Sequence, residues 1–271
     1  MNIISLMMSY PFIMRAVVVG ILVSLCASLL GVCLVLRKLS MIGDGLSHVG
    51  FGALAIASVL GFSPLEITIP IVIAAAFLLL KLTESSKIKG DSAIAIISTG
   101  ALALGVMIIS VSGNGNADLN SYLFGSILAM SNTDMILSVV LSVVVLILFI
   151  VFYNKIFAVT FDEEFARATG INTELFNILI AVLTAVTIVI GMRMMGAMLI
   201  SSLIIFPAIT SMRIFKTFKP VTICSAILSV ICFMIGITLS YIYATPTGAS
   251  IVLVNIAALL IFFIIGKILK K

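Results

Sequence analysis

Uncharged apolar stretches, most of them about 20 residues long, recur along this chain and constrain its fold more than any other feature. A helix rises about 1.5 Å per residue, so a stretch of that length crosses the hydrocarbon core of a membrane. Charged or turn-forming residues separate the stretches, which lie at Ala16–Leu36, Gly45–Leu65, Ile67–Leu80, Ser92–Ala117, Met135–Asn154, Leu175–Met192, Met194–Met212 and Val221–Gly266. The sequence therefore predicts an all-α polytopic membrane protein.

The number of crossings is predicted as nine, with eight as the alternative. Val221–Gly266 is long enough for two crossings, and the turn-forming run Thr245–Gly248 divides it. Only Arg193 separates Leu175–Met192 from Met194–Met212, so these two alternatively form one broken helix and a re-entrant piece. The chain is 63% hydrophobic and only 9% charged, whereas soluble domains carry about 25% charged residues. A soluble fold is thereby excluded, and one membrane domain covers residues 1–271.

The basic residues predict the orientation, because cytoplasmic loops of membrane proteins retain Lys and Arg. With the N-terminus outside and nine crossings, only Arg15 and Arg193 of the fifteen basic residues fall on the outer side. The C-terminus is then cytoplasmic, and Asn114–Asp118 forms an outer loop. The net charge of +5 is a topology signal, and nothing supports nucleic-acid binding.

The first apolar stretch carries small residues at a spacing of four. Gly20, Ser24 and Ser28 follow this spacing. Small residues let helices approach closely within lipid. The pattern predicts close packing, either within one subunit or between two subunits.

Asp44 and His48 are the candidate metal ligands. They lie four residues apart, so they share one helix face, and His48 is the only histidine in the chain. Ionisable residues within membrane segments usually face a pathway or a partner. A carboxylate and an imidazole make half of a transition-metal site, and a two-fold pair of subunits would supply four ligands. Alternatively, Asp44 caps the helix and His48 is satisfied by a neighbouring carbonyl.

A second candidate site is the acidic segment Phe161–Gly170, which reads as a short cytoplasmic helix. An aspartate can cap its start, the glutamates that follow favour its positive end, and a glycine can close it. A helix this short is not stable alone, so either a partner docks on it or it lies passively on the membrane. The residues predicted to carry a partner contact are Asp162, Glu163, Glu164, Phe165, Ala166 and Gly170.

No G-x-x-x-x-G-K-[ST] phosphate loop occurs in the sequence. If the protein pumps with ATP, another chain must therefore bind the nucleotide, and the protein itself is not an enzyme. An ATP-independent secondary metal or proton carrier is the alternative, although coupling ionisable residues are scarce. An intramembrane enzyme that uses Asp44 and His48 lacks an accompanying nucleophile motif.

Six sequence blocks, in order, resemble the ABC-3 class of permeases, the membrane subunits of bacterial ABC importers for zinc, manganese and iron. The blocks extend over nearly the whole chain, from about residue 11 to residue 265. They are Arg37–His48, Asp91–Ile96 with Leu104 and Gly105, Asp118–Gly125, Phe161–Gly170, Gly196–Ala208 and Pro246–Val252.

The resemblance implies a permease fold similar to that of type II ABC importers, in the bacterial cytoplasmic (plasma) membrane. It implies a homodimer, a cytoplasmic ABC ATPase dimer and an extracytoplasmic metal-binding protein as partners. The transported ion would be a divalent metal, with zinc as the leading candidate and manganese or iron as alternatives, and no cofactor is stably bound. Asp44 and His48 match positions of the metal path, and Phe161–Gly170 matches the coupling helix that contacts the ATPase.

Overall fold

A computed structural model describes residues 11–84, 90–112 and 132–268, and all regular secondary structure in these ranges is helical. The predicted outer loop Asn114–Asp118 lies outside these ranges. The helices are α2 (Pro11–Leu36), α3 (Met41–Leu60), α4 (Pro64–Glu84), α5 (Gly90–Val111), α7 (Asn132–Val151), α8 (Tyr153–Phe161), α9 (Glu163–Ala168), α10 (Thr173–Met195), α11 (Ala197–Met212), α12 (Phe218–Tyr243) and α13 (Thr247–Ile268). The predicted all-α class is confirmed.

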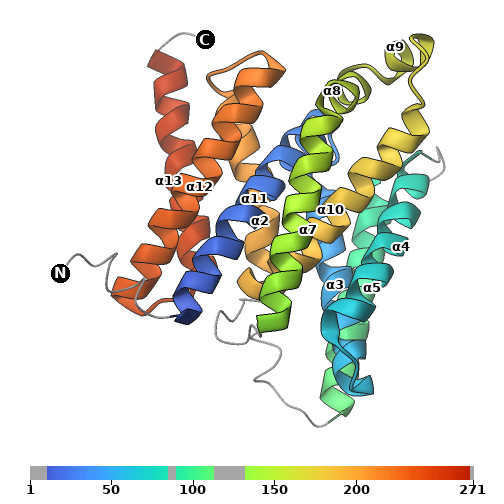
Figure 1. Cartoon of the computed structure of the whole chain (residues 1–271), viewed down its shortest axis with the longest axis vertical. Helices are drawn as coiled ribbons and strands as arrows, with labels where there is room; N and C mark the ends of the chain where they lie inside the picture. Colours follow the sequence, from blue (N-terminus) through green and yellow to red (C-terminus); the bar gives the residue numbers. More distant parts are fainter. Residues whose placement is uncertain (1–10, 85–89, 113–131, 269–271) are drawn as a thin grey trace.

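Within the described residues, eight helices are long and apolar enough to cross a membrane, and α11 is a shorter apolar helix. The 16 residues of α11 extend about 24 Å, less than a hydrocarbon core of about 30 Å. Gly196 separates α10 from α11 with φ 87° and ψ 158°, a conformation essentially restricted to glycine. Figure 1 shows α11 running back antiparallel to α10. The observed count therefore falls within the predicted eight to nine.

Helix α11 lies inside the bundle, in contact with α2, α3, α10, α12 and α13. Leu199, Leu203 and Ile204 on this helix are at most 1% exposed. A Cβ atom at Gly31 of α2 would overlap the carbonyl oxygen of Ile204, so glycine permits the close approach of α2 and α11. A short helix is thus placed where neighbouring helices, rather than lipid, surround it.

The small residues of α2 pack within the subunit, which decides between the two predicted possibilities. Ser225 and Ser229 of α12 donate hydrogen bonds to the carbonyl oxygens of Ser28 and Ser24, at 3.4 and 3.0 Å. A Cβ atom at Gly20 would overlap the ring of Phe233, another α12 residue. The spacing of four therefore forms the α2–α12 contact.

The ends of the helices separate the basic residues. In Figure 1, α8, α9 and the C-terminal ends of α2, α4, α11 and α13 lie at the top. The described basic residues in or next to these segments are Arg37, Lys38, Lys81, Lys155, Arg167, Arg213, Lys216, Lys219 and Lys267. Arg193, near the opposite end, pairs with Asp134 at 3.0 Å. The return of the chain through α11 is what brings the start of α12 to the basic end.

Candidate functional site

Asp44 and His48 share one face of α3, as the spacing predicts. Asp44 Oδ2 lies 3.5 Å from His48 Nε2, and the side chains are 43% and 21% exposed, respectively. The residue at the N-cap of α3 is Ser40, and Asp44 lies inside the first turn. Asp44 is therefore not the helix cap, and its carboxylate is directed toward the imidazole.

Ser201 of α11 joins this pair from a distant part of the sequence. Its Oγ lies 3.3 Å from Asp44 Oδ1 and equally 3.3 Å from the carbonyl oxygen of Ala197. The single hydroxyl proton serves one of these two acceptors at a time. Ser202, the next residue, instead bonds the Leu199 carbonyl of its own helix at 2.8 Å. The sequence contains the pair of serines, but no signal in it indicates which serine meets Asp44.

Glycines hold α3 close to its neighbours at this level. A Cβ atom at Gly45 would lie 2.7 Å from the Cγ2 atom of Ile94 in α5. A Cβ atom at Gly43 would lie 3.1 Å from the Cδ1 atom of Ile204 in α11. Asp44, which lies between these two glycines, is thus held where α3, α5 and α11 converge.

The donor set of one chain is incomplete for a metal ion. His48 Nδ1 is buried and has no hydrogen-bond partner among the described residues. In the same part of the chain, no group of three or more His, Cys, Asp or Glu side chains surrounds a common point. Asp44 and His48 are two candidate ligands, whereas protein zinc sites use three or four. A metal ion held by this pair would need further ligands from a second subunit, from water or from a delivering protein.

The second candidate site forms the predicted short helix, although with different bounds. Helix α9 is Glu163–Ala168, because Phe161 ends α8 and Asp162 is extended between the two helices. The Asp162 carboxylate accepts a hydrogen bond of 2.9 Å from the backbone N–H of Phe165. Gly170 follows the helix with φ +85° and donates its N–H to the carbonyl of Arg167 at 3.1 Å. Both predicted caps are confirmed.

An apolar and acidic surface of α9 faces outward. Phe161 and Phe165 are 74% and 64% exposed, and Glu164 is also exposed. Ala166 is fully buried, so its prediction as an apolar contact is wrong. We call Asp162, Glu164 and Phe165, together with Phe161 at the end of α8, the α9 face.

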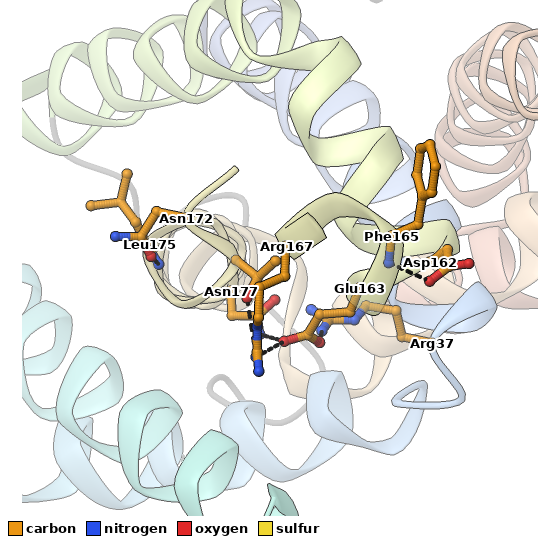
Figure 2. A network of polar contacts seen from close by, with 9 residues as sticks. Arg37, Asp162, Glu163, Phe165, Arg167, Asn172, Leu175 and Asn177 are labelled. Carbon is orange, nitrogen blue, oxygen red and sulfur yellow. Dashed lines mark hydrogen bonds and ion pairs between the residues drawn. The ribbon is translucent and has the colours of Figure 1, made fainter. Parts of the chain in front are cut away.

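Glu163 does not belong to the α9 face, because its carboxylate turns toward the bundle. Figure 2 shows it between side chains of three helical segments. Glu163 Oε2 lies 3.0 Å from Arg37 Nη2, and Oε1 accepts a 3.2 Å hydrogen bond from Asn177 Nδ2. Arg167, on α9 itself, approaches Oε1 at 3.5 Å. The sequence grouped Glu163 with Glu164, but the structure directs the two side chains to different surroundings.

Comparisons with known proteins agree on the class of this chain. The model of the ABC 3 transport family matches residues 9–266. The manganese transport system membrane protein MntC of Halalkalibacterium halodurans is 32% identical over 260 residues, covering 95% of this chain and 89% of the relative. The high-affinity zinc uptake system membrane protein ZnuB of Haemophilus influenzae is 32% identical over 244 residues, covering 90% and 94%.

A solved structure has the same fold. PsaBC from Streptococcus pneumoniae in complex with Fab superimposes with a TM-score of 0.86 at 30% sequence identity. The match covers 96% of this chain and 94% of that chain. The arrangement of α2 to α13 is therefore that of a chain in this solved structure.

Proposed function

This chain belongs to the ABC 3 transport family, and we propose that it is the membrane permease of an ATP-driven importer of divalent transition metal ions. The observation that carries the proposal is the Asp44–His48 pair, 3.5 Å apart on α3 within a permease fold. Relatives named for manganese and for zinc transport support this class of cargo. The protein is the translocation subunit, and the chemistry of ATP hydrolysis belongs to another chain.

The metal path of this proposal runs past Asp44 and His48. Two subunits related by a two-fold axis would offer two carboxylates and two imidazoles, which is a full four-ligand set. The approach of Asp44 Oδ2 to His48 Nε2, at 3.5 Å, supports this assignment, because the carboxylate and the imidazole present their ligand atoms to the same point. Zinc is the leading cargo because imidazole suits zinc better than manganese, which prefers oxygen ligands.

The energy input of this proposal enters through the α9 face. A cytoplasmic ABC ATPase dimer would dock on Phe165 and Glu164, which are exposed on a helix fixed by caps at both ends. An extracytoplasmic metal-binding protein would deliver the ion at the opposite end. The Asp162 cap and the left-handed Gly170 give the ATPase a rigid element to push.

Reconstituted permease, ATPase and binding protein in liposomes test this function directly. Uptake of zinc, manganese and iron, offered in competition, should require ATP hydrolysis and all three proteins. A secondary carrier would instead transport metal with the permease alone, in response to an ion gradient. Uptake that proceeds equally well without ATP would overturn the proposal in favour of that alternative.

Ser201→Ala is expected to weaken metal uptake moderately. The substitution removes the hydroxyl that lies 3.3 Å from Asp44 Oδ1, and a single hydrogen bond is worth about 0.5–1.5 kcal/mol. The apparent KM for metal should rise about 2- to 10-fold. Ser202→Ala is the matched control, because Ser202 bonds only its own helix among the recorded contacts. Equal effects of the two substitutions would contradict a role for Ser201 in the path.

The α9 end of the molecule is expected to face the cytoplasm, because the described basic residues gather there. Single cysteines at the exposed positions Lys267 and Thr133 report on the two ends. The background replaces the native Cys26, Cys33, Cys224 and Cys232. In intact cells an impermeant maleimide should label Thr133→Cys, whereas Lys267→Cys should react only after permeabilisation. The reverse pattern would invert the topology.

A further inference from the structure

Glu163 lies at a junction of three helical segments. Its carboxylate meets Arg37 directly after α2, Asn177 in α10 and Arg167 in α9 (Figure 2). Glu163 is separated from Arg37 by 126 residues of sequence, so this contact joins parts of the chain that no short loop connects. The carboxylate therefore ties α9 to the rest of the bundle.

The Arg37 contact is built differently from the Arg167 contact. The Arg37 side chain is 13% exposed and reaches 3.0 Å, whereas the Arg167 side chain is 74% exposed and reaches 3.5 Å. Charge-assisted hydrogen bonds that are shielded from water are stronger, and exposed ion pairs contribute little. Asn177 is 3% exposed and donates to Oε1, the oxygen of the same carboxylate that does not face Arg37. Arg37 and Asn177 thus fix Glu163, and Arg167 is accessory.

Arg37 stands in a rigid elbow between α2 and α3. Lys38 adopts a left-handed conformation with φ +59°, and its N–H donates to the Val35 carbonyl at 3.1 Å. The Leu39 N–H donates to the Leu34 carbonyl at 2.8 Å. These two bonds form a Schellman closure, which fixes the exit angle of the chain. Helix α3 begins at Met41, so a force on Arg37 reaches α3 through a tight turn instead of a flexible loop.

We propose that Arg37 and Glu163 are a positioning pair that transmits movement of α9 to α3. This inference rests on the proposed function and deepens it. When the ATPase moves the α9 face, Glu163 pulls or pushes Arg37 at the elbow. Asp44 lies in the first turn of the helix that starts at this elbow, and His48 follows one turn later. The ion pair thus links the ATPase contact to the helix that carries the candidate metal ligands.

The test compares two arginines that approach the same carboxylate. In Arg37→Gln, the ratio of ATPase activity with and without the metal-loaded binding protein should fall at least fivefold, and metal uptake should fall with it. The amount of ATPase that copurifies with the permease should stay within twofold of wild type, which shows that the complex still assembles. Arg167→Gln is the matched control, since Arg167 is 74% exposed and, among the described residues, makes only the longer contacts with Glu163, at 3.5 Å, and with Thr173 of α10, at 3.3 Å, and its stimulation should stay within twofold. Arg37→Lys keeps the positive charge and should restore at least half of the stimulation.

A double-substitution cycle separates a linked pair from two independent residues. If Arg37 and Glu163 act together, the double variant with Arg37→Gln and Glu163→Gln should lose no more ATPase stimulation than the single variant that has the larger loss. If the loss of stimulation in the double variant equals the product of the two single losses, the two residues act independently and the proposed pair is refuted. Normal stimulation in Arg37→Gln, or a loss as large in Arg167→Gln, would also overturn it.

A measurement on the permease alone tests the anchoring of α9 by the Arg37–Glu163 pair independently of the transport assignment. Hydrogen exchange of the backbone amides in residues 163–171 should become at least fivefold faster in Arg37→Gln and stay unchanged in Arg167→Gln. Unchanged exchange in Arg37→Gln would refute the anchoring of α9 even if the complex transports metal. If the wild-type complex does not use ATP for uptake, the proposed function fails, and the exchange result still decides whether the anchor exists. If Arg37→Gln does not insert, Glu163→Gln removes the same pair and takes its place in both measurements.

Discussion

Replacement of His48 by alanine is expected to lower metal uptake at least 100-fold while leaving the protein inserted in the membrane. His48 is the only imidazole in the chain, and its ring lies 3.5 Å from Asp44 on the same helix face. No other described histidine, cysteine or acidic group completes a cluster that would replace it. Loss of a residue that supports a metal ligand lowers metal affinity or activity roughly 10- to 100-fold, and loss of the ligand itself should lower it further. Asp44→Ala should have an effect of the same size.

Zinc and manganese uptake by the reconstituted complex measures this effect. Ser47→Ala is the control, because Ser47 is buried next to His48 and bonds only the Asp44 backbone carbonyl, at 2.7 Å, among the recorded contacts. Its uptake should remain within about threefold of wild type, in keeping with the modest net worth of one hydrogen bond. Near-normal metal transport by His48→Ala would refute the assignment of the metal path to this face of α3.

Gly170→Val is expected to uncouple ATP hydrolysis from metal delivery. Gly170 has φ +85°, and a Cβ atom added there would find no atom within 4 Å. The penalty is therefore conformational instead of steric, and amounts to about 1–2 kcal/mol for an L-residue, with a β-branched side chain at the upper end. The C-terminal closure of α9 would be lost, and with it the fixed position of the α9 face. Stimulation of the ATPase by the loaded binding protein should disappear.

Glu164→Lys tests the same surface without touching the backbone. It reverses one charge on the exposed α9 face, so an ATPase groove that accepts an acidic helix start should reject it. Gly170→Asn is the control for Gly170→Val, because asparagine tolerates the left-handed conformation. ATPase activity of the assembled complex, with and without loaded binding protein, separates the variants. If both Gly170→Val and Glu164→Lys keep full stimulation and full uptake, α9 is a passive surface helix.

Features that depend on neighbouring residues followed from the sequence. The charge-free stretches predicted the membrane helices, because the cost of burying charge in lipid acts on each segment separately. The caps of α9 were predicted because Asp162 and Gly170 act on backbone groups within three or four residues. The shared face of Asp44 and His48 followed from helical geometry alone.

The partners of these local features were decided only by the tertiary structure. Ser201 meets Asp44 across 157 residues, and Arg37 meets Glu163 across 126. A membrane helix is apolar on every side, so its sequence does not indicate which side faces protein and which faces lipid. The contacts are instead selected by small residues that allow close approach, such as Gly31 against α11. That selection depends on two surfaces fitting each other, which no single segment encodes. The fit between helices therefore places the short α11 inside the bundle, with Ser201 against the metal-ligand candidates Asp44 and His48.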